Sequence, residues 1–175
     1  SEIVRRVLAD TGVQPHSLEL ELTESVLMAN AEQSSAKLQA LREMGVSLAV
    51  DDFGTGYSSL AYLKRLPITT LKIDKTFITD LNRDPDDTAI TTTIITMAHS
   101  LGLNVVAEGV ETETQLRFLD HFRCDEIQGY WLLKPADPET CLQFIRDWTP
   151  AMADATAPQE AMPAPAELSA AGRPA

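Results

Sequence analysis

Five short apolar segments alternate with helical segments along the chain, and this alternation restricts the fold more than any other feature of the sequence. Each apolar segment ends beside a polar or charged residue of a kind that suits chemistry. We predict strands over residues 18–23, 46–51, 69–73, 103–107 and 124–130. We predict helices over residues 2–10, 31–44, 60–66, 86–101, 112–121 and 138–148. Strands that alternate with helices of this length indicate βα units and a parallel sheet.

The number of predicted strands leaves two architectures open. A complete TIM barrel needs eight βα units in about 250 residues, whereas residues 1–149 hold five predicted strands. The chain is therefore either an open α/β sheet or the C-terminal portion of a (β/α) barrel that begins before Ser1. From Pro150 onward the composition changes to mostly Ala and Pro without apolar periodicity, so we predict a folded region over 1–149 and a disordered tail over 150–175.

The polar residues at the strand ends share one face of the predicted sheet. Side chains on a strand alternate between its two faces, and in the first four strands the large aliphatic residues lie opposite the candidate functional residue. Polar residues also occur at strand ends because those ends are wet, but this does not account for the shared face. The candidate site residues are Glu21, Asp51, Asp52, Lys72, Glu108 and Gln128. Because barrel enzymes build their sites at the C-terminal ends of the strands, this set predicts a metal-dependent hydrolytic site.

Charge and composition exclude several classes of protein. The formal net charge of −12 argues against binding of a nucleic-acid polymer, which relies on Lys and Arg to neutralise phosphates. A small anionic ligand held through bound cations stays compatible with this charge. No window approaches the length of a membrane span, and the N-terminus does not resemble a signal peptide. We expect a cytoplasmic protein in which Cys124 and Cys141 are reduced thiols.

Five strings carry a resemblance to a known family. LELELTES, DDFGTGYSSL, LKIDKTFI, VAEGVET and QGYWLLKP occur in this order, and together they resemble the EAL-domain family of cyclic di-GMP phosphodiesterases. The resemblance implies a bacterial signalling protein with a modified TIM barrel, of which this chain would hold about five C-terminal βα units. It also implies hydrolysis of cyclic di-GMP to linear pGpG with two divalent ions, Mg²⁺ or Mn²⁺.

The resemblance assigns roles to the candidate site residues. Glu21, Asp51 and Asp52 match metal ligands of the family, and hard oxygen ligands without thiolates suit Mg²⁺ or Mn²⁺. Lys72 matches a lysine that holds the attacking water and stabilises developing charge. Glu108 matches a glutamate linked to the second metal and to activation of that water. A purely structural ion pair is the alternative for Lys72.

Four further positions match supporting residues of the family. Gln128 matches a glutamine that orients site groups through hydrogen bonds, although it could simply be a polar strand-end residue. Glu24 matches a glutamate that anchors the loop after Asp52, in which Gly54 and Gly56 adopt conformations closed to other residues. The alternative for Glu24 is a charge in the first turn of the next helix, where the helix dipole favours it.

The chain also departs from the family pattern. It contains no EAL string, and the glutamate of that motif, the arginine after it and an asparagine ligand would all precede Ser1. We therefore expect hydrolysis from the intact parent rather than from residues 1–175 alone. The stretch WLLKP differs from the usual pattern after QGY, which leaves the guanine-binding residues unassigned.

Two other functions compete with hydrolysis of the dinucleotide. One is a non-catalytic cyclic di-GMP receptor, which the retained metal and catalytic positions disfavour. The other is an enolase-like barrel that abstracts a proton with carboxylates, a lysine and Mg²⁺, which the DDFGTG and QGY strings disfavour. The sequence leaves open whether the parent forms a homodimer or carries an upstream sensory or GGDEF domain.

Overall fold

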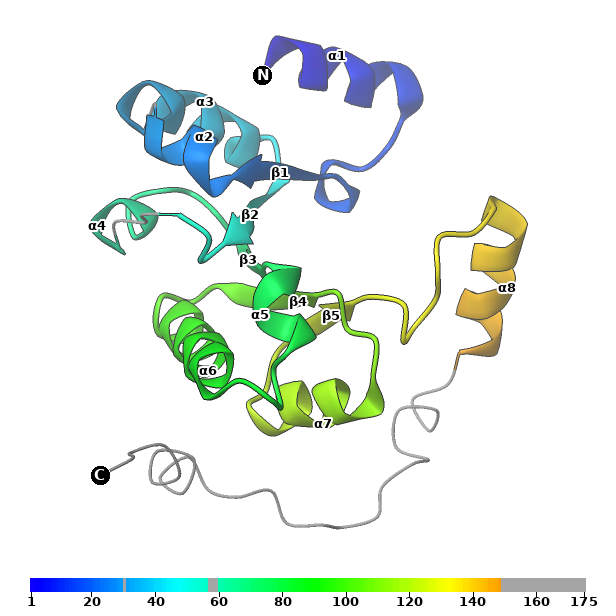
Figure 1. The fold of residues 1–175 in the computed structure, drawn as a ribbon. Coiled ribbons are helices and arrows are strands. Elements are labelled where there is room, and N and C mark those ends of the chain that lie inside the picture. The colour runs from blue at the N-terminus through cyan, green and yellow to red at the C-terminus, as the bar shows by residue number, and fades with distance from the viewer. Residues whose placement is uncertain (30, 57–59, 149–175) are drawn as a thin grey trace. The chain divides into compact units, whose positions relative to one another are not determined.

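The computed structural model describes residues 1–29, 31–56 and 60–148 (Figure 1). The predicted disordered tail over 150–175 lies outside these described residues. Contacts between residues divide the chain into a unit over Ser1–Leu132, which holds the whole sheet, and a second unit from Leu133 onward. Helix α8, Pro138–Asp147, is the helix described in the second unit, and Asp137 caps its N-terminus by accepting a hydrogen bond from the Thr140 amide.

The five predicted strands all occur, and they form one parallel sheet. They are β1 (Glu19–Thr23), β2 (Ser47–Phe53), β3 (Thr70–Ile73), β4 (Asn104–Glu108) and β5 (Glu126–Gln128). Each strand pairs with the next strand in the sequence, in the order β1-β2-β3-β4-β5. A doubly wound sheet reverses its strand order at a switch point, whereas a barrel wall adds strands in sequence. The topology is therefore that of a TIM-barrel-like fold.

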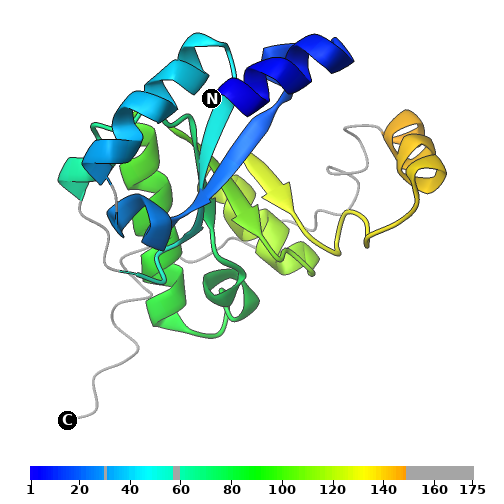
Figure 2. The same ribbon diagram turned by 90° about the horizontal axis from the view of Figure 1, so that it is seen from above.

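Helical elements connect the strands, and three of the short ones were not predicted from the sequence. In the first unit the helical elements are α1 (Glu2–Thr11), the 3₁₀ turn η1 (Pro15–Ser17), α2 (Glu24–Ala29), α3 (Ala31–Glu43), α4 (Leu60–Leu63), α5 (Lys75–Thr79), α6 (Pro85–Ser100) and α7 (Glu113–His121). Helices α2 and α5 are too short to show an apolar period, which explains why the sequence pattern missed them. Helix α6 packs on β3 and β4, and Figure 2 shows α3 and α6 on the same side of the sheet.

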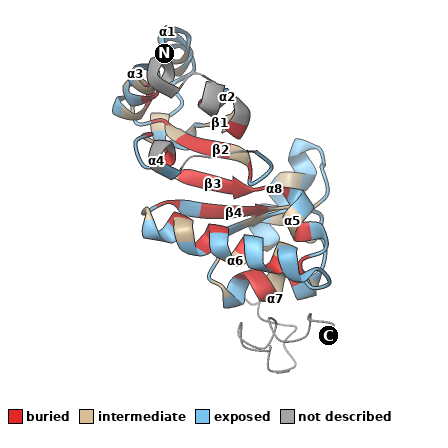
Figure 3. Cartoon of the chain, turned by 60° about the vertical axis from the view of Figure 1, so that its left-hand side comes forward, coloured by how far each residue is buried: buried red, intermediate tan, exposed pale blue. Residues whose placement is uncertain are grey.

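The central strands carry most of the core. Leu48, Val50, Leu71, Ile73 and Val105 are each at most 1% exposed, and Figure 3 shows β2, β3 and β4 as largely buried. These are the large aliphatic residues that the alternation places opposite the polar set. Full burial of each such side chain contributes roughly 1.5–3 kcal/mol. The polar strand-end residues therefore lie on the other face of a sheet that is stabilised by this buried aliphatic core.

Within the described residues, no helix combines the length and the apolar character needed to cross a bilayer.

Candidate functional site

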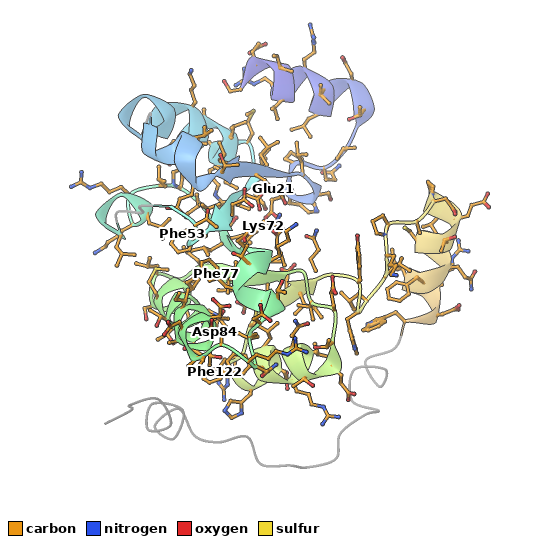
Figure 4. The ribbon with its side chains drawn as sticks, viewed as in Figure 1. Glu21, Phe53, Lys72, Phe77, Asp84 and Phe122 are labelled. Atoms are coloured by element: carbon orange, nitrogen blue, oxygen red, sulfur yellow. The ribbon has the colours of Figure 1, made fainter. Side chains whose placement is uncertain are left out.

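Lys72 is the centre of a cluster of charged side chains at the C-terminal ends of the strands. Its ammonium nitrogen Nζ lies 2.6 Å from Glu108 Oε1, 2.7 Å from Glu21 Oε1 and 3.1 Å from Asp51 Oδ1. Lys72 is only 5% exposed, and Figure 4 shows it beside Glu21. Three carboxylates from three different strands thus surround one buried cation.

The strand register explains why these residues meet. Lys72 pairs with Val106 on β4, Glu108 pairs with Gln128 on β5, and Asp51 pairs with Thr23 on β1, all near the strand ends. Because alternate residues of a strand share a face, Glu21, Asp51, Lys72 and Glu108 all project to the side opposite the aliphatic core. The convergence that the alternation predicted for these four residues is present in the structure.

Asp52 joins the cluster through an irregularity in β2. Strict alternation would send its side chain to the face opposite that of Asp51. Instead, Asp52 has a left-handed backbone with φ 55°, and the pairing with β3 shifts register between Val50 and Phe53. As a result, Asp51, Asp52 and Glu108 each offer a carboxylate oxygen, and these oxygens lie within 4.8 Å of one another.

The charges in the cluster shift the pKa of several groups. Burial disfavours the charged form of Lys72, but its close contacts with the carboxylates of Glu108, Glu21 and Asp51 outweigh it and hold the pKa of the ammonium above its ordinary value. Burial raises the pKa of Asp52, and the neighbouring Asp51 and Asp74 raise it further. The site is therefore a region of excess negative charge that one lysine only partly neutralises.

One oxygen of this group lacks a hydrogen bond. Asp51 Oδ1 is buried, and although it is close enough to Lys72 for an ion pair, it has no hydrogen-bond partner of good geometry within the described part of the chain. Buried polar atoms are normally paired. An oxygen-only donor set of closely spaced carboxylates is what a hard divalent cation such as Mg²⁺ or Mn²⁺ prefers. The residues present therefore fit such an ion.

Glu24 contacts the loop that follows Asp52. It begins α2, is 2% exposed, and accepts a hydrogen bond from the Gly54 amide through Oε2 at 3.0 Å. Gly54 has φ 100°, and a side chain there would meet Phe77 Cε2 at 2.8 Å. Gly56 does not have a positive φ, so the expected backbone conformation closed to other residues is wrong for this glycine. Its constraint is one of space, because a Cβ at Gly56 would lie 2.7 Å from Glu24 Oε1. The two glycines thus leave room for a close contact between the loop and Glu24, while residues 57–59 lie outside the described residues.

We expect Glu24→Ala to weaken metal binding without removing a ligand. Loss of the Gly54 hydrogen bond frees the loop next to Asp52, and supporting residues of this kind are typically worth about 10- to 100-fold in metal affinity. The rate of cyclic di-GMP hydrolysis that we expect of the intact parent should therefore fall at low Mg²⁺ and recover in part at high Mg²⁺. Glu24→Gln, which keeps an acceptor for the Gly54 amide, is the matched control. A loss of rate that added Mg²⁺ leaves unchanged would contradict the role of Glu24 as a loop anchor.

Gln128 pairs with Glu108 in the sheet, but its side chain makes no hydrogen bond within the described residues. It is exposed, and its side-chain amide has no hydrogen bond to any residue that the structure describes, whereas its backbone carbonyl accepts from the Val110 amide at 3.1 Å. The role of Gln128 in orienting site groups therefore stays a prediction.

Asp74 is an acidic residue beside the cluster that was not among the candidate site residues. In the structure Asp74 caps the N-terminus of α5 and accepts hydrogen bonds from the Thr76 amide and hydroxyl, at 2.9 and 2.5 Å. Although burial opposes its charge, these bonds hold the pKa of Asp74 below its ordinary value, and a hydrogen bond with Asp52 acts in the same direction. An Asp directly after a strand and two residues before a Thr is a capping signal that the sequence contained.

The cysteines do not belong to this cluster. Burial raises the pKa of Cys124 to about 11, so this thiol is protonated at neutral pH and is a poor nucleophile. Both cysteines are free thiols.

Comparison with known proteins identifies the class to which this fold and site belong. A family model described as "EAL domain" matches residues 1–135. The chain therefore belongs to the EAL domain family.

Individual relatives agree with this assignment. The cyclic di-GMP phosphodiesterase NbdA of Pseudomonas aeruginosa is 50% identical over 143 residues, which cover 82% of this chain and 18% of NbdA. A solved structure of the PaMucR phosphodiesterase in complex with c-di-GMP is 48% identical with a TM-score of 0.77, and the match covers 79% of this chain and 56% of that chain. The chain thus spans well under two thirds of these relatives.

A third relative was solved with divalent metal ions. Complexes of Klebsiella pneumoniae BlrP1 with cyclic di-GMP, one containing calcium and one containing manganese, are 32% identical with a TM-score of 0.72. The match covers 77% of this chain and 34% of BlrP1.

Proposed function

We propose that this chain forms the part of a phosphodiesterase site that binds the metal ions and contains the essential lysine, and that the intact protein hydrolyses cyclic di-GMP to linear pGpG. The observation on which this rests is the buried Lys72 among Glu21, Asp51 and Glu108, with Asp52 beside them. The reaction and the ligand are those of NbdA and PaMucR, and membership of the EAL domain family connects them to this chain.

Asp51, Asp52 and Glu108 are the residues we propose as ligands of the divalent ions, with Glu21 next to them. Adjacent aspartates at a strand end can serve two ions, because each supplies its own carboxylate. Bound Mg²⁺ or Mn²⁺ would polarise the phosphoryl oxygens and lower the pKa of the attacking water. The net charge of −12 is consistent with such cations, since they would reduce the repulsion between an anionic dinucleotide and a negatively charged protein.

Lys72 and Glu108 are the residues we propose to act on the reacting atoms. In the hydrolysis, water adds to phosphorus, one P–O bond to a ribose 3′ oxygen breaks, and that oxygen takes up a proton to leave a 5′-phosphorylated linear product. Glu108 would accept the proton of the water. Lys72, whose raised pKa keeps it charged at neutral pH, would hold the water and stabilise the charge that develops on the phosphoryl oxygens.

The test is product formation from cyclic di-GMP by the longest reading frame that contains this chain, with the 175-residue chain assayed in parallel. We expect pGpG to accumulate with Mn²⁺ or Mg²⁺. Its formation should stop when EDTA is added, because the carboxylates and the substrate phosphate are all negatively charged and repel one another without bound cations. Cyclic di-GMP that binds but stays intact under saturating Mn²⁺ would contradict hydrolysis and favour the receptor function.

A further inference from the structure

Gln115 is a buried residue that joins the segment after β3 to the segment after β4. It is 6% exposed. Its side-chain oxygen Oε1 accepts hydrogen bonds from the amides of Glu111 and Thr112, at 2.8 and 2.9 Å. Its side-chain nitrogen Nε2 donates to the carbonyls of Ile78 and Thr79, at 2.8 and 3.3 Å. Two donors on one side and two acceptors on the other fix the orientation of the amide.

The two segments joined by Gln115 follow Glu108 and Lys72, the residues that we propose to act on the reacting atoms. Glu111 comes three residues after Glu108 at the end of β4, and helix α5, which contains Ile78 and Thr79, begins three residues after Lys72 at the end of β3. Gln115 therefore fixes the segment beyond Glu108 to the segment beyond Lys72. The ion pair between these two residues, at 2.6 Å, lies at the other end of this connection.

The segment beyond Glu108 is also held from the side of β5. The Val110 amide donates to the Gln128 carbonyl at 3.1 Å, and the Val110 carbonyl accepts from the Trp131 amide at 2.9 Å. A Cβ at Gly129 would lie 2.2 Å from the Val110 carbonyl oxygen, so only glycine fits this approach. Residues 109–112 are thus bound to β5 through their backbone and to α5 through Gln115.

A ligand-binding role for Gln115 does not fit its contacts. The residue lines a cavity of about 530 Å³ together with Thr79, Asp80, Arg83 and Glu111. However, its Oε1 already accepts two hydrogen bonds and its Nε2 already donates two, so the amide offers nothing further to a molecule in that cavity.

We propose that Gln115 is a positioning residue, which holds Glu108 and Lys72 in the relative position that the pairing of β3 and β4 gives them, by connecting the turn after β4 to helix α5. The catalytic part of this inference rests on the proposed function. Displacement of a catalytic group by about 1 Å can cost on the order of 100-fold in rate, and the four hydrogen bonds of the buried Gln115 amide oppose a shift of the segments that follow Glu108 and Lys72.

The test compares Gln115→Leu with Asp125→Ala. Asp125 accepts hydrogen bonds from the Val105 amide and from His99, both at 2.8 Å, near the opposite end of β4. Its loss should lower the melting temperature without disturbing the site. One readout is the NMR signal of the Lys72 ammonium, together with amide exchange at Glu111 and Thr112, because neither needs substrate or metal. The other readout is kcat and KM for cyclic di-GMP.

We expect Gln115→Leu to expose the Glu111 and Thr112 amides to exchange, to shift the Lys72 signal, and to lower kcat on the order of 10- to 100-fold with little change in KM. Asp125→Ala should keep the Lys72 signal and kcat. If Gln115→Leu does not fold, Gln115→Glu replaces it, since a carboxylate keeps both acceptor bonds and loses both donor bonds; it should shift the Lys72 signal while Glu111 and Thr112 stay protected.

Two results separate this inference from the proposed function. A Lys72 signal that stays in place in both Gln115 variants would overturn the positioning role. A signal that moves in a protein whose unsubstituted form hydrolyses no cyclic di-GMP would support the positioning of Lys72 and overturn the proposed function alone.

Discussion

Replacing Asp51 by Asn is expected to lower the rate of cyclic di-GMP hydrolysis by at least about 100-fold at saturating Mn²⁺. Asp51 offers one of the three closely spaced carboxylate oxygens, and its Oδ1 is buried without a hydrogen bond. An amide of the same shape removes the charge that a divalent ion requires. The measurement is pGpG formation by the intact protein under single-turnover and steady-state conditions.

The control for this prediction is Asp86→Asn. Asp86 is an exposed residue in the first turn of α6, so the same chemical change there should leave the rate within about twofold, as expected of a surface substitution. Near-normal activity of Asp51→Asn at saturating metal would rule out the metal-binding role of Asp51.

Replacing Lys72 by Met is expected to have two large effects. The folded protein should lose about 2–4 kcal/mol of stability without metal, because three carboxylates keep their charges but lose their cation. Hydrolysis should fall by at least about 100-fold, since no other basic side chain is described among these carboxylates to replace the ammonium of Lys72 at the reacting atoms. Urea unfolding measures the first effect and pGpG formation the second.

The two effects of Lys72→Met should respond differently to Mn²⁺. The metal should restore part of the stability, because it neutralises the same carboxylates, but it should not restore the rate. In the unsubstituted protein, the raised pKa of Lys72 means that the ion-pair stability is fully present below the ordinary lysine value of 10.5 and is lost only at higher pH. The matched control is Lys37→Met on the exposed side of α3. A Lys72→Met protein that is as stable and as active as this control would contradict both assignments.

The alternation of side chains along the strands predicted much of this arrangement. Leu48, Leu71 and Val105 fall on one face and are buried, while Glu21 and Lys72 fall on the other and form an ion pair. The period of two is a property of every extended strand, so a sequence that places aliphatic and charged residues in alternate positions determines which of them converge.

The local backbone geometry could not be predicted in the same way. Asp52 reaches the cluster because it adopts a left-handed conformation where β2 shifts register against β3. A non-glycine residue with positive φ is uncommon, and no repeating pattern of apolar and polar residues in the sequence predicts one. Its place at the end of a predicted strand made Asp52 a candidate site residue, but the alternation did not put it on the shared face, and its role as a ligand came from the resemblance to the EAL-domain strings.

Contacts between side chains and distant segments of the chain also could not be predicted from the sequence. Thr112 and Gln115 form a capping box at the start of α7, and their spacing in the sequence is the usual one for this motif, although we did not predict it. What the sequence did not show is that the Gln115 amide also reaches α5, a contact across 37 positions of the chain. Long-range contacts of this kind depend on the assembled sheet and cannot be inferred from local residue order.

The central claim is that Asp51, Asp52 and Glu108 bind divalent ions beside Lys72 and next to the substrate. It is tested most directly by anomalous diffraction at the manganese edge, on crystals of the intact protein grown with Mn²⁺ and cyclic di-GMP. We expect manganese density bounded by these three carboxylates, with a phosphate of the dinucleotide against it and Lys72 within hydrogen-bonding distance of the reacting groups. Bound cyclic di-GMP with no manganese at these carboxylates, or manganese at some other place in the domain, would contradict the claim.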